Sequence, residues 1–281
     1  MSDQIPAPNP PYLPPVATHR AVGHNLLAGR RILVAGGGQQ DYGQPDPPAG
    51  IGLAIAVTCA REGAAVAISD IDSAAAERVA ARVREHGRPA CALVGDASDE
   101  PDTARIVSAA VDGLDGLDGL VCNVGITAGD RLADTTVADW DRVLAVNTRS
   151  HFLAIKHGLP KLPPGGSIVL VSSTAAALPS SMNQPAYATS KAALTGLALF
   201  VAREAAQRRV RINIVMPSLI DTPLGRLANA VKPDRAATPI PLGRQGTAWE
   251  VGNATAFLLS DLASYTTGST LVVDGGLLTV P

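Results

Sequence analysis

Short apolar runs alternate with longer amphipathic stretches from Arg31 almost to the end of the chain. The runs are apolar at consecutive positions rather than at every second one, which is typical of strands that helices cover on both sides of a parallel sheet. This pattern predicts strands at Ile32–Ala35, Ala65–Ser69, Ala90–Val94, Leu120–Cys122, Ser167–Val171, Val210–Val215 and Leu271–Val273.

The stretches between these runs have helical periodicity. They predict helices at Ile51–Glu62, Ser73–His86, Asp99–Asp112, Val137–Leu159, Tyr187–Gln207 and Ala248–Leu259. Two starts carry an N-cap signal, because Thr136 is followed three residues later by Asp139 and Thr247 by Glu250. Strand and helix alternate over about 240 residues, which predicts one doubly wound α/β domain with a parallel sheet of about seven strands.

Composition narrows the class of protein. Hydrophobic residues make up 46% of the 281 positions and charged residues 17%, which supports a large core and excludes a disordered chain. The net charge of −2 argues against a dedicated binder of nucleic acid or anionic membranes, which needs surplus positive charge. The sequence has no run of 18 apolar residues and no apolar signal core, so we expect neither a membrane span nor a secretion signal.

The cysteine spacing bears on metal binding and on the cellular compartment, and the N-terminal composition bears on the domain boundary. Cys59, Cys91 and Cys122 do not lie at metal-ligand spacing from one another or from a histidine, so we predict no metal site. Three thiols without a disulfide framework indicate a reducing compartment, and we expect a cytoplasmic protein. Residues 1–24 are Pro-rich and lack periodicity, which predicts an extended arm or a disordered tail before a folded domain at 25–281.

Glycines gather where the first predicted strand meets the first helix. The strand runs into Gly36 and two further glycines, and the helix opens at Gly50, Ile51 and Gly52. Such glycines let the backbone approach a pyrophosphate, which lies against the free amides of the helix N-terminus. The context predicts a Rossmann-type dinucleotide site rather than a P-loop, because no lysine follows the glycines. Residues 39–48 interrupt the turn, and we interpret them as an insertion that loops away from the phosphates. Such an insertion either hinders cofactor entry or helps to shape a neighbouring pocket or a subunit contact.

Two aspartates follow the second and third predicted strands. Asp70 is placed to accept hydrogen bonds from the adenosine ribose hydroxyls and to repel a 2′-phosphate, which favours NAD over NADP. Neither Ala49 nor Ile71 supplies a positive charge for that phosphate. Alternatively, Asp70 caps the following helix, a role equally open to Asp72. Asp96 either faces the adenine or caps the next turn.

Tyr187 and Lys191 lie four residues apart in a predicted helix, so their side chains share one face, one turn apart. A free phenol ionises at about pH 10 and is a poor base at neutrality. A neighbouring ammonium and an oxidised nicotinamide both favour the phenolate, which makes this pair a candidate acid/base. A tyrosine and a lysine at this spacing often occur by chance, so the other motifs of the chain decide whether this pair is catalytic.

These other motifs lie at the ends of the predicted strands and in one helix. Ser172-Ser173 follows the fifth strand, and Asn147 lies in the fourth helix. The other motifs are Asn123-Val124-Gly125, Pro217–Thr222 and Val273–Gly276. With these motifs in this order, the chain resembles the short-chain dehydrogenase/reductase family over about residues 28–276.

The resemblance implies roles for individual residues. Tyr187 would be the catalytic acid/base, Lys191 would lower its pKa and bind the nicotinamide ribose, and Ser173 would hold the substrate oxygen. Asn147 would anchor a water that links Lys191 to solvent. From the residues and the resemblance together, the candidate contacts of the dinucleotide are Gly36, Gly50, Ile51, Gly52, Asp70, Asp96, Asn123, Gly125, Tyr187, Lys191, Ile220 and Thr222.

The chain departs from the family pattern near the reacting residues as well as at the insertion. Ser173 lies 14 residues before Tyr187, one more than the commonest spacing, so Ser172 or Thr174 remains a candidate in its place. Ser218 stands where the family usually has glycine. These changes leave the implied catalysis in place and affect the fine geometry of the site.

The implied reaction is reversible hydride transfer between a secondary alcohol or its ketone and a nicotinamide, with Tyr187 moving the proton. Residues 219–245 are expected to cover the substrate pocket as an apolar lid, whose prolines exclude one continuous helix. The few charges of this lid favour a neutral, apolar substrate. Alternatively, Arg226, Lys232 and Arg235 are placed to meet an anion.

Two other functions stay open, namely a dinucleotide-binding regulator or scaffold without turnover, and enoyl reduction or dehydration on the same fold. The intact set of four catalytic candidates disfavours the first. The four-residue interval between Tyr187 and Lys191 disfavours the second, because enoyl reductases of similar fold generally have a wider one. The resemblance implies a homo-oligomer, a tetramer or else a dimer, that acts on a small molecule without nucleic-acid or membrane partners.

Overall fold

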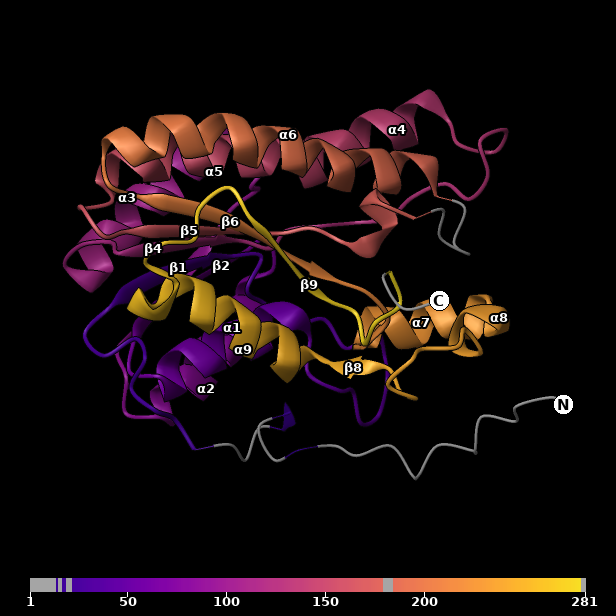
Figure 1. Cartoon of the computed structure of the whole chain (residues 1–281), viewed down its shortest axis with the longest axis horizontal. Helices are drawn as coiled ribbons and strands as arrows, with labels where there is room; N and C mark the ends of the chain where they lie inside the picture. The colour runs from indigo at the N-terminus through magenta and orange to yellow at the C-terminus, as the bar shows by residue number, and fades with distance from the viewer. Residues whose placement is uncertain (1–13, 15–16, 19–21, 179–183, 279–281) are drawn as a thin grey trace, which may run out of the picture.

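Seven parallel strands form one sheet in the order β3-β2-β1-β4-β5-β6-β9 (Figure 1). The structure, a computed structural model, describes residues 14, 17–18, 22–178 and 184–278. The strands are β1 Arg31–Ala35, β2 Ala65–Asp70, β3 Ala90–Val94, β4 Gly119–Cys122, β5 Ser167–Val171, β6 Arg211–Pro217 and β9 Thr270–Val273. The predicted doubly wound α/β fold is confirmed.

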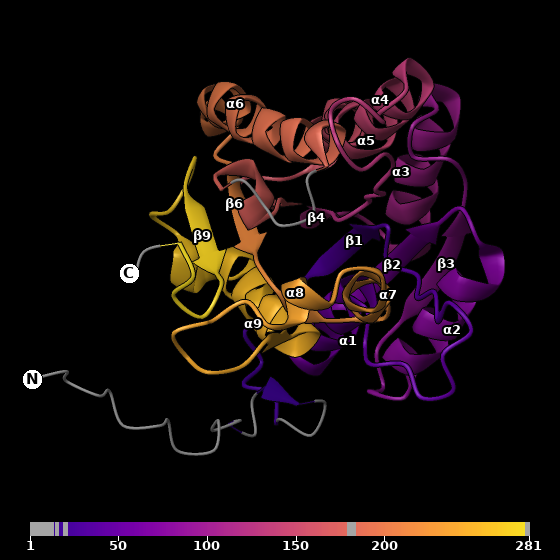
Figure 2. The same cartoon turned by 90° about the vertical axis from the view of Figure 1, so that its right-hand side faces the viewer.

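Helices cover both faces of this sheet (Figure 2). One face carries α1 Ile51–Arg61, α2 Ser73–Arg84 and α9 Ala248–Leu259, and the other carries α3 Glu100–Leu114, α4 Val137–Leu144, α5 Ser150–Gly158 and α6 Pro185–Gln207. Each face has its own hydrophobic core. Ile32 and Val34 pack in one core and Leu33 in the other. This burial on both faces explains why the strands read as continuous apolar runs.

Side-chain caps fix the starts of several helices. Thr136 accepts a hydrogen bond from the Asp139 amide at 3.0 Å, and Thr247 forms a reciprocal capping box with Glu250, as predicted. Asp72 caps α2 by accepting from two amides of the first turn. Each cap satisfies amides that have no partner within their own helix.

The helix predicted at Val137–Leu159 is interrupted. After α4, a π-helical turn runs from Ala145 to Arg149 before α5 begins at Ser150. Such a turn inserts an extra residue, which the hydrophobic period of the sequence does not reveal, and it frequently lies at a functional site. Short 3-10 turns lie at Leu159–Lys161, Thr174–Ala176 and Asp261–Ala263.

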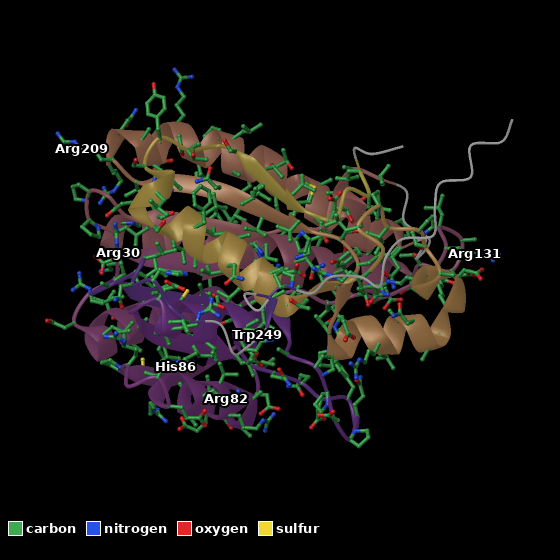
Figure 3. All side chains as sticks on the ribbon, turned by 60° about the horizontal axis from the view of Figure 1, so that its bottom comes forward. Arg30, Arg82, His86, Arg131, Arg209 and Trp249 are labelled. Carbon is green, nitrogen blue, oxygen red and sulfur yellow. The ribbon has the colours of Figure 1, made fainter. Side chains whose placement is uncertain are left out.

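Two short helices lie beyond the carboxyl end of β6 (Figure 1). They are α7 Pro223–Val231 and α8 Pro233–Ala236, and they are flanked by the paired short strands β7 Ile220–Asp221 and β8 Gly246–Thr247. The predicted lid is thus broken into two helices, as its prolines require. Figure 3 shows Arg131, from the loop after β4, at this end of the molecule, opposite Arg30 and Arg209.

Most of the predicted N-terminal arm, residues 1–24, lies outside the described residues. Within it, Ala17 is buried, and its carbonyl accepts a hydrogen bond from the Thr247 hydroxyl at 2.9 Å. This contact attaches the arm to the start of α9. In the part of the chain that the structure describes, no helix is both long and apolar enough for a membrane crossing.

Candidate active site

A cleft of about 670 Å³ opens at the carboxyl edge of the sheet. Residues at or after the ends of five strands line it, namely Gly36, Asp70, Asn123, Ser172 and Pro217. The chain builds the sheet outward from β1 to β3 and then returns to the other side of β1 with β4. Open parallel sheets bind ligands at such a reversal of strand order.

The start of α1 packs very close to the end of β1. A Cβ at Gly52 would lie 2.3 Å from the Gly36 carbonyl oxygen, so only glycine fits there. Asn123 Nδ2 donates to the same oxygen at 2.6 Å and ties the end of β4 to this turn. Gly50, Ile51 and Gly52 line the cleft at the helix N-terminus, where free amides and the helix dipole favour a phosphate. These residues therefore fit the pyrophosphate of a dinucleotide.

The insertion at residues 39–48 returns to the cleft, so the expectation that it loops away from the phosphates is wrong. Gln39 Oε1 accepts a hydrogen bond from the Gly50 amide at 2.8 Å, and Gln39, Gln40 and Tyr42 line the cleft. The path of the loop depends on such side-chain hydrogen bonds, which no hydrophobic pattern encodes. Sequence analysis missed these three residues, and their position directly after the glycines of the turn is the only signal for them.

The far end of the insertion contacts the lid. Gln44 Nε2 donates to the Pro223 carbonyl at 2.8 Å, at the start of α7. Arg226, one turn further along α7, donates to the Asp46 carbonyl at 3.3 Å. The insertion therefore connects the phosphate-binding turn with the helix that covers the other end of the cleft.

The two aspartates predicted to meet the adenosine both line the cleft. Asp70 accepts hydrogen bonds from the Gly38 and Asp72 amides, each at 3.1 Å. Burial raises the Asp70 pKa, and these hydrogen bonds act in the opposite direction. Because Asp72 caps α2, that role is not left to Asp70. Asp96 accepts from the Ser98 amide and hydroxyl at 2.8 and 2.7 Å, so it closes the turn before α3 while lining the cleft.

Tyr187, Lys191 and Ser173 meet at the end of β5. The first two lie one turn apart on α6, and the Ser173 side chain is hydrogen-bonded to Tyr187. Lys191 Nζ donates to the Val171 carbonyl at 2.9 Å and lies 5.9 Å from the centroid of the Tyr187 ring. All three side chains line the cleft. The structure therefore brings together the residues that the sequence singled out for proton transfer.

The neighbouring serines make different contacts. Ser172 is buried, and its hydroxyl donates to the Lys191 carbonyl at 2.9 Å, which ties β5 to α6. Ser173 instead reaches the Tyr187 hydroxyl, and Thr174 begins the next helical turn. Of the three hydroxyls that the sequence left open, the geometry favours Ser173 as the partner of a substrate oxygen.

Asn147 lies fully buried in the π-helical turn, behind the cleft. Its Oδ1 accepts from the Ile126 amide at 2.8 Å, and its Nδ2 donates to the Ile126 carbonyl at 2.9 Å and to the Ser190 hydroxyl at 3.0 Å. Ser190 in turn donates to the Tyr187 carbonyl at 2.7 Å. Asn147 therefore fixes the loop after β4 against the turn of α6 that carries Tyr187 and Lys191.

Lys191 is only 3% exposed. Burial lowers its pKa to about 8, because the charged form loses its water. A Cβ at Gly125 would lie 3.2 Å from Nζ, so a larger residue there would crowd the ammonium. Cys122 lies at the end of β4, and burial raises the pKa of its thiol to about 12. This thiol therefore remains protonated at neutral pH.

Burial raises the pKa of Tyr187, while the Ser173 hydrogen bond and the positive charge of Arg235 act in the opposite direction. The sequence-based expectation was a pKa lowered by Lys191. In the protein alone the Tyr187 pKa is raised instead, because burial penalises the phenolate more than Ser173 and Arg235 favour it. Sequence analysis named Arg235 only as a possible partner of an anion and missed its proximity to the phenol.

The remaining predicted cofactor residues also lie at the cleft. Ile220 is buried in β7, and the Thr222 hydroxyl accepts from the Gly225 amide at 3.0 Å as the N-cap of α7. All twelve predicted dinucleotide contacts line the cleft, and of the predicted catalytic residues only Asn147 lies behind it. Among the described residues, no group of three His, Cys, Asp or Glu side chains has the arrangement of a metal site.

Comparisons with known proteins match most of the chain. A family model described as enoyl-(acyl carrier protein) reductase matches residues 48–278. The chain is 35% identical over 264 residues to 2-(S)-hydroxypropyl-CoM dehydrogenase 3 of Xanthobacter autotrophicus, with 91% of this chain and 99% of that protein covered. It is 35% identical over 239 residues to the (3R)-3-hydroxyacyl-CoA dehydrogenase of Mus musculus, with 81% and 92% covered.

Solved structures agree with these relatives. A short chain dehydrogenase from Burkholderia cenocepacia, solved in complex with NADP, superposes with a TM-score of 0.81 at 34% identity, with 89% of this chain and 98% of that chain covered. A short-chain dehydrogenase/reductase from Burkholderia xenovorans gives a TM-score of 0.82 at 33% identity, with 90% and 97% covered.

The tight turn at α1 generates a stability prediction. Gly52→Ala places a Cβ against the Gly36 carbonyl, and we expect this overpacking to lower the free energy of unfolding by about 1–3 kcal/mol. Gly50→Ala is the matched control, because its Cβ would meet only the Gln39 side chain, at 3.6 Å. Thermal unfolding without added nucleotide measures both. Equal midpoints for the two variants would contradict the described packing of α1.

Proposed function

This chain belongs to the short-chain dehydrogenase/reductase family, and we propose that it is an oxidoreductase that interconverts a secondary alcohol and a ketone with NAD(H). The meeting of Tyr187, Ser173 and Lys191 in one cleft with a glycine-lined helix N-terminus carries the proposal. The relatives named as dehydrogenases of hydroxypropyl-CoM and of hydroxyacyl-CoA support the same type of reaction.

The cleft offers a separate site for each part of the dinucleotide. We assign the pyrophosphate to the start of α1, the adenosine ribose to Asp70, the nicotinamide ribose to Lys191 and the carboxamide to Ile220 and Thr222. When bound, the nicotinamide accepts or supplies the hydride. The residues of the chain position the reacting groups, exclude water and move the proton.

Tyr187 is the acid/base of this proposal. In alcohol oxidation its phenolate takes the hydroxyl proton, and in ketone reduction its phenol gives the proton to the oxygen that becomes the alcohol. Ser173 donates a hydrogen bond to the same oxygen, and this bond strengthens as negative charge develops there. Lys191, with a pKa of about 8, is mostly protonated at neutral pH, and its ammonium is available to the hydroxyls of the nicotinamide ribose.

Reduction of a carbon–carbon double bond is the second candidate, because the matched family model is described as an enoyl reductase. We place the carbonyl reaction first for two reasons. The hydroxyls of Ser173 and Tyr187 are hydrogen-bonded to each other and can converge on one substrate oxygen, and both curated relatives described above are named dehydrogenases. The intact reacting set gives no support to a silent regulator.

Replacing the acid/base tests the proposal. We expect Tyr187→Phe to lower kcat by about 10²- to 10⁴-fold, because general acid–base catalysis contributes a factor of this size. NADH affinity, measured by tryptophan fluorescence, is expected to change little. Steady-state reduction of a panel of ketones provides the rates, and wild-type turnover by the variant would exclude Tyr187 as the proton donor.

The adjacent serines supply a control for this experiment. Ser173→Ala is expected to lower kcat, because it removes a hydrogen bond to the reacting oxygen. Ser172→Ala removes only the buried bond to the Lys191 carbonyl, so its main effect is a loss of about 1 kcal/mol of stability. The reverse order of effects on kcat would reassign the substrate-binding hydroxyl to Ser172.

For the choice of dinucleotide, we propose NAD over NADP. The Asp70 carboxylate lines the cleft at the end of β2, where it would meet the ribose hydroxyls and repel a 2′-phosphate. The Burkholderia cenocepacia neighbour was solved with NADP, so the fold itself does not decide the choice.

Kinetics with the two reduced dinucleotides test this choice. We expect kcat/KM to be at least about tenfold higher with NADH than with NADPH, because like charges that face each other are costly. Asp70→Asn is expected to reduce that ratio, while Asp96→Asn, which removes a charge from the next strand end, is the control. A clear preference of the wild type for NADPH would contradict the assignment.

We further propose a homo-oligomer, a tetramer or else a dimer, in the cytoplasm. Apolar side chains stand exposed on α6, where Leu199 is 58% and Phe200 75% exposed. Phe152 on α5 and Val272 on the edge strand β9 are partly exposed as well. Exposed apolar groups on these elements support association through them. The three free cysteines support a reducing compartment.

A further inference from the structure

The lid, residues 219–245, carries four positive charges, and their ion pairs differ. Arg244 forms an ion pair with Glu250. Arg226 is paired with Asp221 through two hydrogen bonds of 2.8 and 2.9 Å. Lys232 forms an ion pair with Asp130. Arg235 lines the cleft together with Tyr187, and in the described part of the chain no carboxylate forms an ion pair with it.

The guanidinium of Arg235 is held in place by α7. Its Nη1 donates to the Gly225 carbonyl at 3.3 Å and to the Asn229 side chain. Its Nε and Nη2 have no hydrogen-bond acceptor among the residues that the structure describes. Two donors of a fixed fork therefore stay available, and such a fork matches the two oxygens of a carboxylate.

The surroundings of Arg235 indicate which kind of ligand its charge would bind. The side chain is half-buried, and burial lowers its pKa, so the charge is partly desolvated. The residues of α7 that line the same cleft carry no charge, namely Pro223, Leu224, Gly225 and Ala228. A partly desolvated cation without a counter-charge gains most from an anion that enters the cleft. Tyr187 and Arg235 also influence each other electrostatically, which places the cation near the reacting phenol.

We propose that Arg235 binds a carboxylate of the substrate, so that the enzyme acts on anionic hydroxy acids and oxo acids in preference to neutral alcohols and ketones. This inference rests on the proposed function, because it names the substrate class of the same site. It selects the anion over the neutral, apolar substrate that the composition of the lid favours.

A cation at this position also stabilises the phenolate, and the test separates the two effects. An effect on Tyr187 changes the rate with every substrate alike. An effect on a carboxylate changes only the anionic substrate. The ratio of kcat/KM for 3-oxobutanoate to kcat/KM for its neutral amide, measured at one pH with saturating NADH, cancels the first effect and retains the second.

We expect the wild type to prefer the anion and Arg235→Met to lower the ratio by about 10- to 100-fold, the usual value of a hydrogen-bonded charge. Arg235→Lys, which keeps the charge without the fork, is expected to give an intermediate ratio. Arg226→Gln is the matched control, because it removes the same charge from the lid at a paired, exposed site. An unchanged ratio in Arg235→Met, or a wild type that prefers the amide, would overturn the proposal.

Binding gives a second measurement that does not depend on turnover. Calorimetry of butyrate and of butyramide with the enzyme–NAD⁺ complex is expected to show tighter binding of butyrate, lost in Arg235→Met and kept in Arg226→Gln. Equal binding of the two ligands by the wild type would overturn the carboxylate site. Turnover of the neutral amide alone would leave the proposed function standing, whereas butyrate binding without reduction of any ketone would sink the proposed function and keep the anion site.

Discussion

The burial of the Lys191 ammonium is the constraint on which the site depends. A charge removed from water is costly unless hydrogen bonds replace the lost solvation. The carbonyl of Val171 provides such a bond at the end of β5, and the absence of a side chain at Gly125 leaves room for Nζ. The ammonium can therefore lie beside Tyr187 only when three elements are correctly placed relative to one another. These are the end of β5, the loop after β4 and helix α6. Asn147 fixes the position of the loop relative to the helix, because its side chain is hydrogen-bonded to both.

The sequence revealed the layers of the fold and the side chains that meet in the cleft, because both follow from local pattern. Strands buried on both faces read as apolar runs, and residues four apart on a helix share one face. The π-helical turn around Asn147 and the path of residues 39–48 were not predictable in this way. Both depend on hydrogen bonds between segments distant in sequence, such as that between Gln44 and the Pro223 carbonyl. The electrostatics of Tyr187 likewise depend on burial and on Arg235, which only the folded chain brings near.

The insertion and the lid give this cleft a feature beyond the shared fold. Gln39 satisfies an amide at the N-terminus of α1, where a phosphate would bind, and Gln44 holds the start of α7. The cofactor end and the substrate end of the cleft are thus mechanically connected by ten residues outside the sheet. A nucleotide that displaces the Gln39 side chain acts on the same loop that contacts the lid.

The proposed reaction requires that the Tyr187 phenol, buried and weakly acidic in the protein alone, becomes a base when positive charge gathers around it. The most direct measurement is a titration of tyrosinate absorbance, taken as the difference between the wild type and Tyr187→Phe, with and without saturating NAD⁺. We predict an apparent pKa above the ordinary value of about 10 in the protein alone, and a fall of at least about one pH unit with NAD⁺. The same pKa in both titrations would contradict the assignment of Tyr187 as the acid/base.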